Sequence, residues 1–165
     1  ADQTIFLDEF IELDEWRGNH RIVPGGSYAF FYSADQSLVQ RTQQALASVA
    51  GLEVIDPGSF GSLLNFPQDG TRIPNLVVVA NAPGYIGFKR GQDRGPPQGA
   101  HGYLPQITKT MNGIFLASGP RIPAQTHLPD IKNVHIYPLV LALLDIENAA
   151  SIDGEPSVLL PYLVD

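Results

Sequence analysis

The sequence predicts a mixed α/β or α+β fold, and three observations carry this prediction. Residues 27–55 have the pattern of a strand, a helix and a second strand. Residues 75–80 form an apolar run rich in valine, which is typical of a buried strand. Residues 137–144 are an apolar segment with Pro138 near its start, where a helix accepts proline. The chain therefore combines extended segments with at least two helices.

The composition is that of a chain with a real core and many turns, and it narrows the classes of function. Of the 165 residues, 44% are hydrophobic and 16% are charged, and there are 16 glycines and 14 prolines. The net charge of -7 argues against a nucleic-acid polymer as a partner, because the phosphate backbone attracts basic proteins. The absence of cysteine excludes disulfides and thiolate chemistry. No transmembrane segment is expected, because every apolar run is far shorter than the roughly 20 residues that cross a bilayer.

The first third of the chain contains the clearest local signals. Residues 4–8 include a continuous apolar run that predicts a strand buried on both faces, and residues 10–13 continue the extended pattern. A Pro-Gly-Gly turn then precedes the strand expected over residues 27–32. Ser33 stands three residues before Gln36, as in a capping box, and Gly51 has the position of a residue that ends a helix. The apolar residues between them repeat at helical spacing: Leu38, Val39, Ala45, Leu46 and Val49.

The remaining elements follow in order. Residues 52–55 predict the second strand of the strand–helix–strand unit. Residues 89–99 predict an irregular loop, because they hold three basic side chains, three glycines and two prolines. Residues 113–118 predict a further strand, and residues 158–163 form a short apolar tail.

The common motifs of catalysis and cofactor binding are absent from the sequence. It has no H-E-x-x-H metalloprotease motif, no G-x-S-x-G elbow, no phosphate-binding G-x-x-x-x-G-K-[ST] loop and no dinucleotide fingerprint. We therefore assign no catalytic residue. Each of the four histidines, taken alone, fits a surface or core-edge position better than a metal site.

His101 is the one histidine whose sequence context points to chemistry. It stands in Gly99-Ala100-His101-Gly102-Tyr103, where glycines on both sides leave the imidazole uncrowded and allow a close approach to a metal or an anion. The preceding basic loop would favour a phosphate group. Zinc takes three or four protein ligands, so His101 contributes to a site and does not make one.

These residues resemble a known family. The His-Gly-Tyr segment, Met111 and residues 113–120 together are similar to the C-terminal signature of nucleotide pyrophosphatase/phosphodiesterases, which belong to the alkaline phosphatase superfamily. Residues 131–146 look like the Asn-Val-x-x-Tyr helix of that family, and Asp153-Gly154 looks like its closing turn. The resemblance is weaker over residues 4–13 and 72–77.

The resemblance implies both a fold and an activity. The fold would be the C-terminal portion of an alkaline-phosphatase-like core with an inserted small α+β cap lobe. Its segments would be a core strand over residues 1–23, the cap lobe over 24–88, and a core segment with the His-Gly-Tyr motif over 89–165. The activity would be zinc-dependent hydrolysis of phosphodiester or pyrophosphate bonds in a nucleotide or another small molecule. His101 would be one ligand in a site of two zinc ions.

The same resemblance implies an incomplete catalyst. The family's nucleophile and its other metal ligands precede the part that this chain resembles, so we expect the chain alone to be inactive and to hold no zinc. A periplasmic or secreted location is typical of bacterial relatives.

Two alternatives remain open on the sequence. The chain is either a non-enzymatic binding or interaction module, or part of a phosphonate hydrolase or phosphomonoesterase of the same superfamily. We also expect a homo-oligomer, because Phe6, Leu7, Phe115 and Leu116 fall on predicted strands whose edges or faces need a partner.

Overall fold

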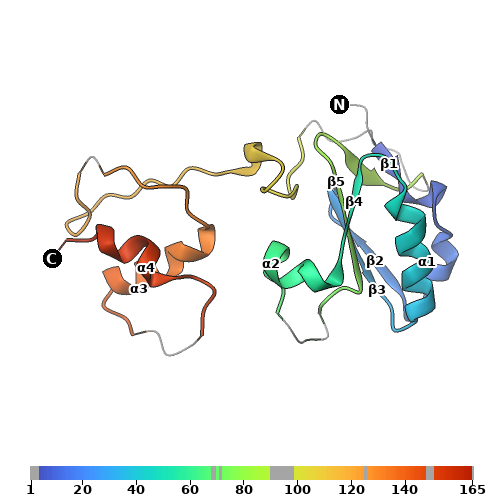
Figure 1. Ribbon diagram of the computed structural model, residues 1–165, viewed down its shortest axis with the longest axis horizontal. Helices are drawn as coiled ribbons and strands as arrows, with labels where there is room; N and C mark the ends of the chain where they lie inside the picture. Colours follow the sequence, from blue (N-terminus) through green and yellow to red (C-terminus); the bar gives the residue numbers. More distant parts are fainter. Residues whose placement is uncertain are drawn as a thin grey trace. The chain divides into compact units, whose positions relative to one another are not determined.

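The computed structural model describes residues 4–67, 70, 72–89, 99–124, 126–147 and 151–164. The chain forms two compact units, the first ending at Asn112 and the second beginning at Gly113. Figure 1 traces both units along the sequence, and each is described here by itself. The three-segment division expected from the family resemblance stays a prediction.

The first unit is built on a four-stranded antiparallel sheet. Its strands are β2 (Arg21–Pro24), β3 (Tyr28–Tyr32), β4 (Leu52–Ile55) and β5 (Leu76–Ala80), in the order β2-β3-β5-β4. The three strands expected over residues 27–32, 52–55 and 75–80 are therefore confirmed as β3, β4 and β5. The central strand β5 is buried at all five positions, as its valine-rich composition predicts.

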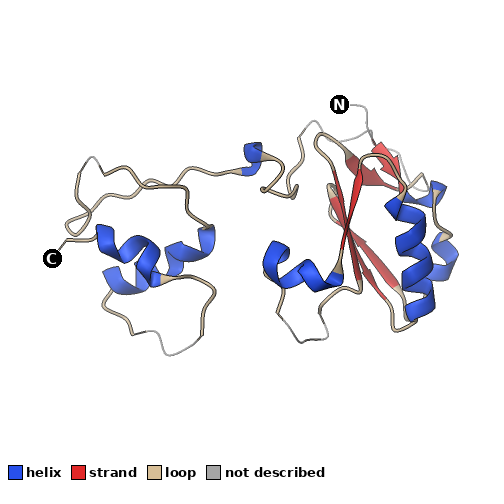
Figure 2. Ribbon diagram, in the orientation of Figure 1, coloured by secondary structure: helices blue, strands red, loops and turns tan. Residues whose placement is uncertain are grey.

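Helices cover both faces of this sheet (Figure 2). Helix α1 (Gln36–Ala47) packs on one face, and helix α2 (Phe60–Leu64), which follows a short 3-10 turn, packs on the other. Successive side chains of β5 point to opposite faces. Leu76, Val78 and Ala80 join the core cluster under α1, whereas Val77 and Val79 join the cluster with Phe60 of α2. The sheet is thus the middle layer of a three-layer unit.

The N-cap of helix α1 lies two residues after Ser33, the expected capping residue. Its N-cap is Asp35, whose carboxylate accepts the main-chain N–H groups of Ser37 and Leu38 at 2.9 and 3.1 Å. Ser33 instead accepts the N–H of Asp35 at 2.9 Å, so it supports the cap without being the cap. The buried face of the helix consists of Leu38, Val39, Thr42 and Leu46. Thr42 is the member that the apolar spacing did not predict.

A second, two-stranded sheet joins segments far apart in the sequence. Strand β1 (Thr4–Phe6) pairs in parallel with β6 (Tyr85–Gly87). The strand expected over residues 4–8 is shorter than predicted, because a 3-10 turn (Leu7–Glu9) follows β1 at once. The prediction of an extended segment over residues 10–13 is wrong, because a turn and a second 3-10 helix (Leu13–Trp16) occupy this region.

The second unit has its regular secondary structure in short helices among the residues that the structure describes. Helix α3 (Ile136–Leu143) confirms the helix expected over residues 137–144, and it packs against α4 (Pro156–Leu159). The strand expected over residues 113–118 is wrong, because this segment is irregular in the structure. None of the described strands pairs with this segment, and the side chains of Ile114 and Leu116 are 90% and 89% exposed. Among the described residues, no helix has the length and apolar character needed to span a membrane.

Candidate functional site

His101 lies on the wall of a pocket of about 310 Å³ in the first unit. Its side chain is exposed rather than packed into the core. The pocket is lined by small residues, two ring side chains and one proline: Pro24, Gly25, Gly26, Tyr85, Gly99, Ala100 and His101. Only the imidazole of His101 among these side chains is a good metal ligand, and the residue is exposed.

The opposite wall of the pocket is the turn between β2 and β3, with the first residue of β6. The N–H of Gly25 donates to the carbonyl oxygen of Tyr28 at 2.7 Å, which closes the turn. The N–H of Ile86 donates to the carbonyl oxygen of Gly26 at 2.6 Å, which fixes β6 beside that turn. Tyr85 is therefore held at the pocket by main-chain bonds on its own strand. The wall is rigid because regular sheet structure positions it.

The His101 segment is fastened to this scaffold on both sides of the histidine. The hydroxyl of Ser27 donates a hydrogen bond to the carbonyl oxygen of His101. The phenol of Tyr103 donates to the carbonyl oxygen of Gly84 at 2.9 Å, and Tyr103 is 8% exposed. The next residue, Leu104, belongs to the core cluster under α2. The main chain of the segment is thus fixed while the imidazole stays at the surface.

Gly102 explains why glycine follows the histidine. It adopts φ +87°, a conformation that residues with a side chain rarely adopt. A Cβ at this position would lie 2.9 Å from the hydroxyl oxygen of Ser27 and equally close to the ring of Tyr28. The glycine at 102 therefore allows the main chain to approach the protein's own hairpin closely. A Cβ on Gly99, by contrast, would meet nothing within 4 Å.

The described residues supply one metal donor at this pocket and do not form a zinc site by themselves. In the part of the chain that the structure describes, no group of three or more His, Asp or Glu side chains is able to hold a metal ion. Two other histidines are engaged elsewhere. His20 shares a hydrogen bond with Ser33 at 2.7 Å, and Nδ1 of the buried His135 accepts the N–H of Glu155 at 3.0 Å. The fourth, His127, is exposed in the second unit.

The basic loop expected to favour phosphate is partly neutralised where it is described. The ammonium group of Lys89 lies 2.5 Å from a carboxylate oxygen of Glu9, and this hydrogen bond raises the pKa of Lys89. The main-chain N–H of Lys89 donates to both carboxylate oxygens of Asp8, at 2.9 and 3.0 Å. Arg90 and Arg94, the other two basic residues of the expected loop, lie outside the described residues.

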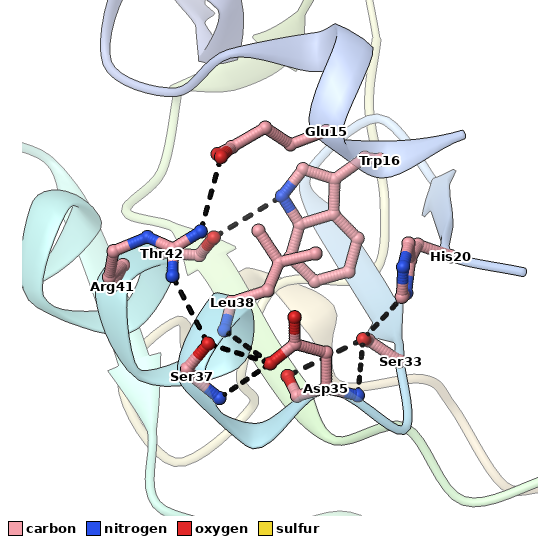
Figure 3. Close-up of polar contacts among 9 residues, drawn as sticks. All are labelled: Glu15, Trp16, His20, Ser33, Asp35, Ser37, Leu38, Arg41 and Thr42. Carbon is pink, nitrogen blue, oxygen red and sulfur yellow. Dashed lines mark hydrogen bonds and ion pairs between the residues drawn. The ribbon is translucent and has the colours of Figure 1, made fainter. Parts of the chain in front are cut away.

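A second cluster of polar residues lies in the first unit and is structural (Figure 3). The hydroxyl of Ser33 contacts His20 at 2.7 Å, a pairing that also occurs in nucleophilic catalysis. Ser33 is only 5% exposed, however, and its oxygen already accepts the N–H of Asp35. A substrate would have no access to that hydroxyl. Around it, Arg41 pairs with Glu15 at 3.1 Å, which shows one member of the acidic N-terminal run in an ordinary ion pair.

The sequence motif names His101 as a candidate and does not indicate the residues that hold its main chain. A serine in a turn carries no local signal, so Ser27 could not be predicted from the sequence. Tyr103 was visible in the motif, but its bond to Gly84 depends on the packing of β6. Both hydrogen bonds join segments that are distant in the sequence, so a local motif does not predict them.

Comparison with solved structures identifies a similar fold. The chain superposes on human ectonucleotide pyrophosphatase/phosphodiesterase 5 with a TM-score of 0.79 and 21% identity, over 99% of this chain and 41% of that one. It superposes on the murine protein with a TM-score of 0.78 and 20% identity, over 98% and 41%. A structure of an inactive murine variant in complex with AMP matches equally well. Neither the family models nor the curated proteins yield a match to the sequence.

These matches confirm the fold that the motifs predicted. The chain is a mixed α/β structure with the fold of one part of these ectonucleotide pyrophosphatase/phosphodiesterase 5 structures, and it spans 41% of their length.

Proposed function

We propose that this chain is part of a hydrolase of phosphodiester or pyrophosphate bonds and supplies one metal ligand, His101, to its active site. One observation carries the proposal: the histidine of the His-Gly-Tyr motif is exposed in a pocket while its main chain is fastened to the sheet. An imidazole that is held but left open is suited to bind an ion. The similarity of fold to nucleotide pyrophosphatase/phosphodiesterases supports the same assignment.

The residues of this chain have a limited part in the chemistry. Zinc, when bound, would stabilise the negative charge that develops on the phosphorus oxygens. His101 would offer a neutral ring nitrogen as a ligand. The glycines and Tyr85 would shape the wall of the pocket beside it. No residue of this chain is proposed as the nucleophile, so the chain alone is proposed to be catalytically incomplete and to hold no zinc of its own.

We propose a small phosphodiester or nucleotide as the substrate of the complete enzyme. The complex of the murine neighbour with AMP supports this class of ligand. Comparison of hydrolysis rates for phosphodiesters, phosphomonoesters and phosphonates would separate this reaction from those of other members of the superfamily.

The test compares the 165-residue chain with the full gene product on bis-p-nitrophenyl phosphate in the presence of zinc. We expect no turnover by the chain alone and zinc-dependent turnover by the full product. In the full product, His101→Ala should remove most of the activity. His127→Ala serves as the matched control, since His127 is an exposed histidine in the second unit. Robust zinc-dependent turnover by the 165 residues alone, or full activity in His101→Ala, would reject the proposal.

A further inference from the structure

We propose that Ser27 is the positioning residue of this site: its buried hydroxyl fixes the main chain of His101 and so holds this residue at the wall of the pocket. The catalytic consequence of this inference rests on the proposed function, whereas the anchoring itself does not. The hydroxyl donates to the carbonyl oxygen of His101, across 74 residues of sequence. The motif around His101 does not indicate that Ser27 is its partner.

The first step is that Ser27 is itself immobile. It is fully buried. Its carbonyl oxygen accepts the N–H of Ala80, the last residue of β5, at 2.7 Å. The residue after it, Tyr28, begins β3. Ser27 is therefore fixed by the central strands of the sheet, and a hydrogen bond from its side chain transmits that position to the His101 segment.

The second step is that the bond is a requirement of the packing and not an accident of the surface. A buried hydroxyl without a partner costs about 1–3 kcal/mol, so the hydroxyl of Ser27 strongly favours the arrangement in which His101 receives it. Gly102 makes the arrangement feasible, because any Cβ there would approach the hydroxyl oxygen of Ser27 to 2.9 Å. The choice of glycine at 102 and serine at 27 thus serves a single contact.

The third step concerns the conformational freedom that remains to His101 once its main chain is anchored. With Ser27 holding the carbonyl group of His101 and Tyr103 bound to Gly84, the main chain on both sides of the imidazole is set. Only rotation about the side-chain bonds of His101 remains. A ligand that is already held loses less freedom when it binds an ion, which improves affinity. Ser27 therefore acts on binding through His101, without touching the ion.

The anchoring is tested on the 165-residue chain by NMR. In Ser27→Ala, the heteronuclear NOE values of residues 100–102 should fall, because their main chain loses the hydrogen bond that fixes it. Ser33→Ala is the matched control, since Ser33 is also a buried serine of the first unit but contacts His20 and Asp35. It should leave residues 100–102 unchanged. Equal NOE values at residues 100–102 in wild type and Ser27→Ala would overturn the anchoring.

Two further variants keep the test decisive if Ser27→Ala does not fold. Ser27→Cys retains a weaker donor of nearly the same shape and should give intermediate NOE values. Tyr103→Phe removes only the second fastening, the bond to Gly84. It should loosen the same residues while leaving Ser27 in place. If neither variant changed the NOE values of residues 100–102, the anchoring would be rejected.

The consequence for binding is measured in the full gene product by competition with a chromogenic zinc chelator. We expect Ser27→Ala to weaken zinc binding about tenfold, with partial recovery in Ser27→Cys and no change in Ser33→Ala. Unchanged zinc affinity in a Ser27→Ala protein with a loosened segment would reject the positioning role and leave the proposed function intact. Unchanged zinc affinity in His101→Ala would instead reject the proposed function, while the NMR result would still decide the anchoring.

Discussion

The indole N–H of Trp16 donates to the hydroxyl oxygen of Thr42 at 3.2 Å inside the core of the first unit. The bond joins the 3-10 helix Leu13–Trp16 to the buried face of α1, and the ring of Trp16 packs edge-on against Phe31 of β3 at 5.0 Å. Figure 3 shows Trp16 and Thr42 beside the N-terminal turn of the helix. A polar bond in an otherwise apolar contact thus sets the position of the N-terminal segment on the sheet.

Replacing this threonine tests that bond. Thr42→Val keeps the shape but leaves the buried indole N–H without an acceptor, so the free energy of unfolding should fall by about 1–3 kcal/mol. Thr42→Ser, which retains the hydroxyl, should lose less. Urea denaturation followed by fluorescence reports this directly, because Trp16 is the one tryptophan of the sequence. Equal stability of the valine and serine variants would contradict the assignment.

A methyl group at Gly102 should disturb the candidate site, whereas one at Gly99 should not. Gly102→Ala forces a left-handed conformation on alanine, at a cost of about 1–2 kcal/mol, and drives its Cβ against Ser27 and Tyr28. Gly99→Ala places its Cβ in open space. Thermal unfolding and the NMR signals of the His101 ring measure both effects. A Gly102→Ala protein with wild-type stability and wild-type ring signals would show that the contact is dispensable.

The N-cap of α1 predicts a pH dependence. The hydrogen bond from the Ser37 hydroxyl, followed by the bond from the Leu38 N–H, lowers the pKa of Asp35 below its ordinary value of 3.8. A carboxyl with a lower pKa in the folded state stabilises the fold above the unfolded value, and this stabilisation is lost as the pH falls through the folded pKa. The helix should therefore weaken below about pH 4.

Asp35→Asn separates this effect from general acid unfolding. Asparagine caps a helix but does not ionise, so the variant should show a shallower loss of stability between pH 5 and about pH 2.5. Urea midpoints for both proteins across this range provide the measurement. Two parallel curves would mean that the ionisation of Asp35 does not contribute.

The second unit depends on a glycine at a close contact between helices. A Cβ on the buried Gly154 would lie 2.2 Å from the carbonyl oxygen of Val134. Gly154→Ala should therefore force the turn before α4 away from the turn before α3 and accelerate amide exchange in α3. Gly119→Ala is the control in the same unit, because its Cβ would meet nothing within 4 Å. Equal exchange in both variants would contradict the expected clash.

Exposed apolar side chains predict self-association. Ile114 and Leu116, which the sequence placed on a strand, are 90% and 89% exposed. Contiguous apolar surface favours contact with another protein surface, so the chain should associate at high concentration. The double variant Ile114→Ser with Leu116→Ser should shift the mass measured by light scattering toward the monomer. Ile107→Ser, at a 60% exposed position of the first unit, is the control. A monomeric wild-type chain would refute the expected oligomer.

Local patterns predicted the elements whose signals are contained in a few residues. The valines of β5 and the apolar repeat of α1 report burial directly, because side-chain periodicity follows the geometry of each element. The same reasoning failed for residues 113–118, since an apolar run becomes a strand only when another strand pairs with it. Ser33 and Asp35 are both good caps, and only the position of the first helical residue distinguishes them.

Contacts between distant segments could not be predicted from the sequence. The parallel pairing of β1 with β6 joins residues about 80 positions apart, as Thr4 aligns with Tyr85. The support of His101 by Ser27 is of the same kind. His101 could be named as a candidate from its motif, whereas the residues that hold its main chain could be identified only from the fold.

The wide separation of Ser27 and His101 also orders events during folding. Closing a loop of this length is entropically costly, so the contact should form only after β3, β4 and β5 have assembled the surface that receives it. His101 would then reach its final position last, when the sheet is already complete. A chain caught before that step would have its sheet intact and the His101 segment unattached, so this segment should detach before the sheet is lost as the protein is denatured.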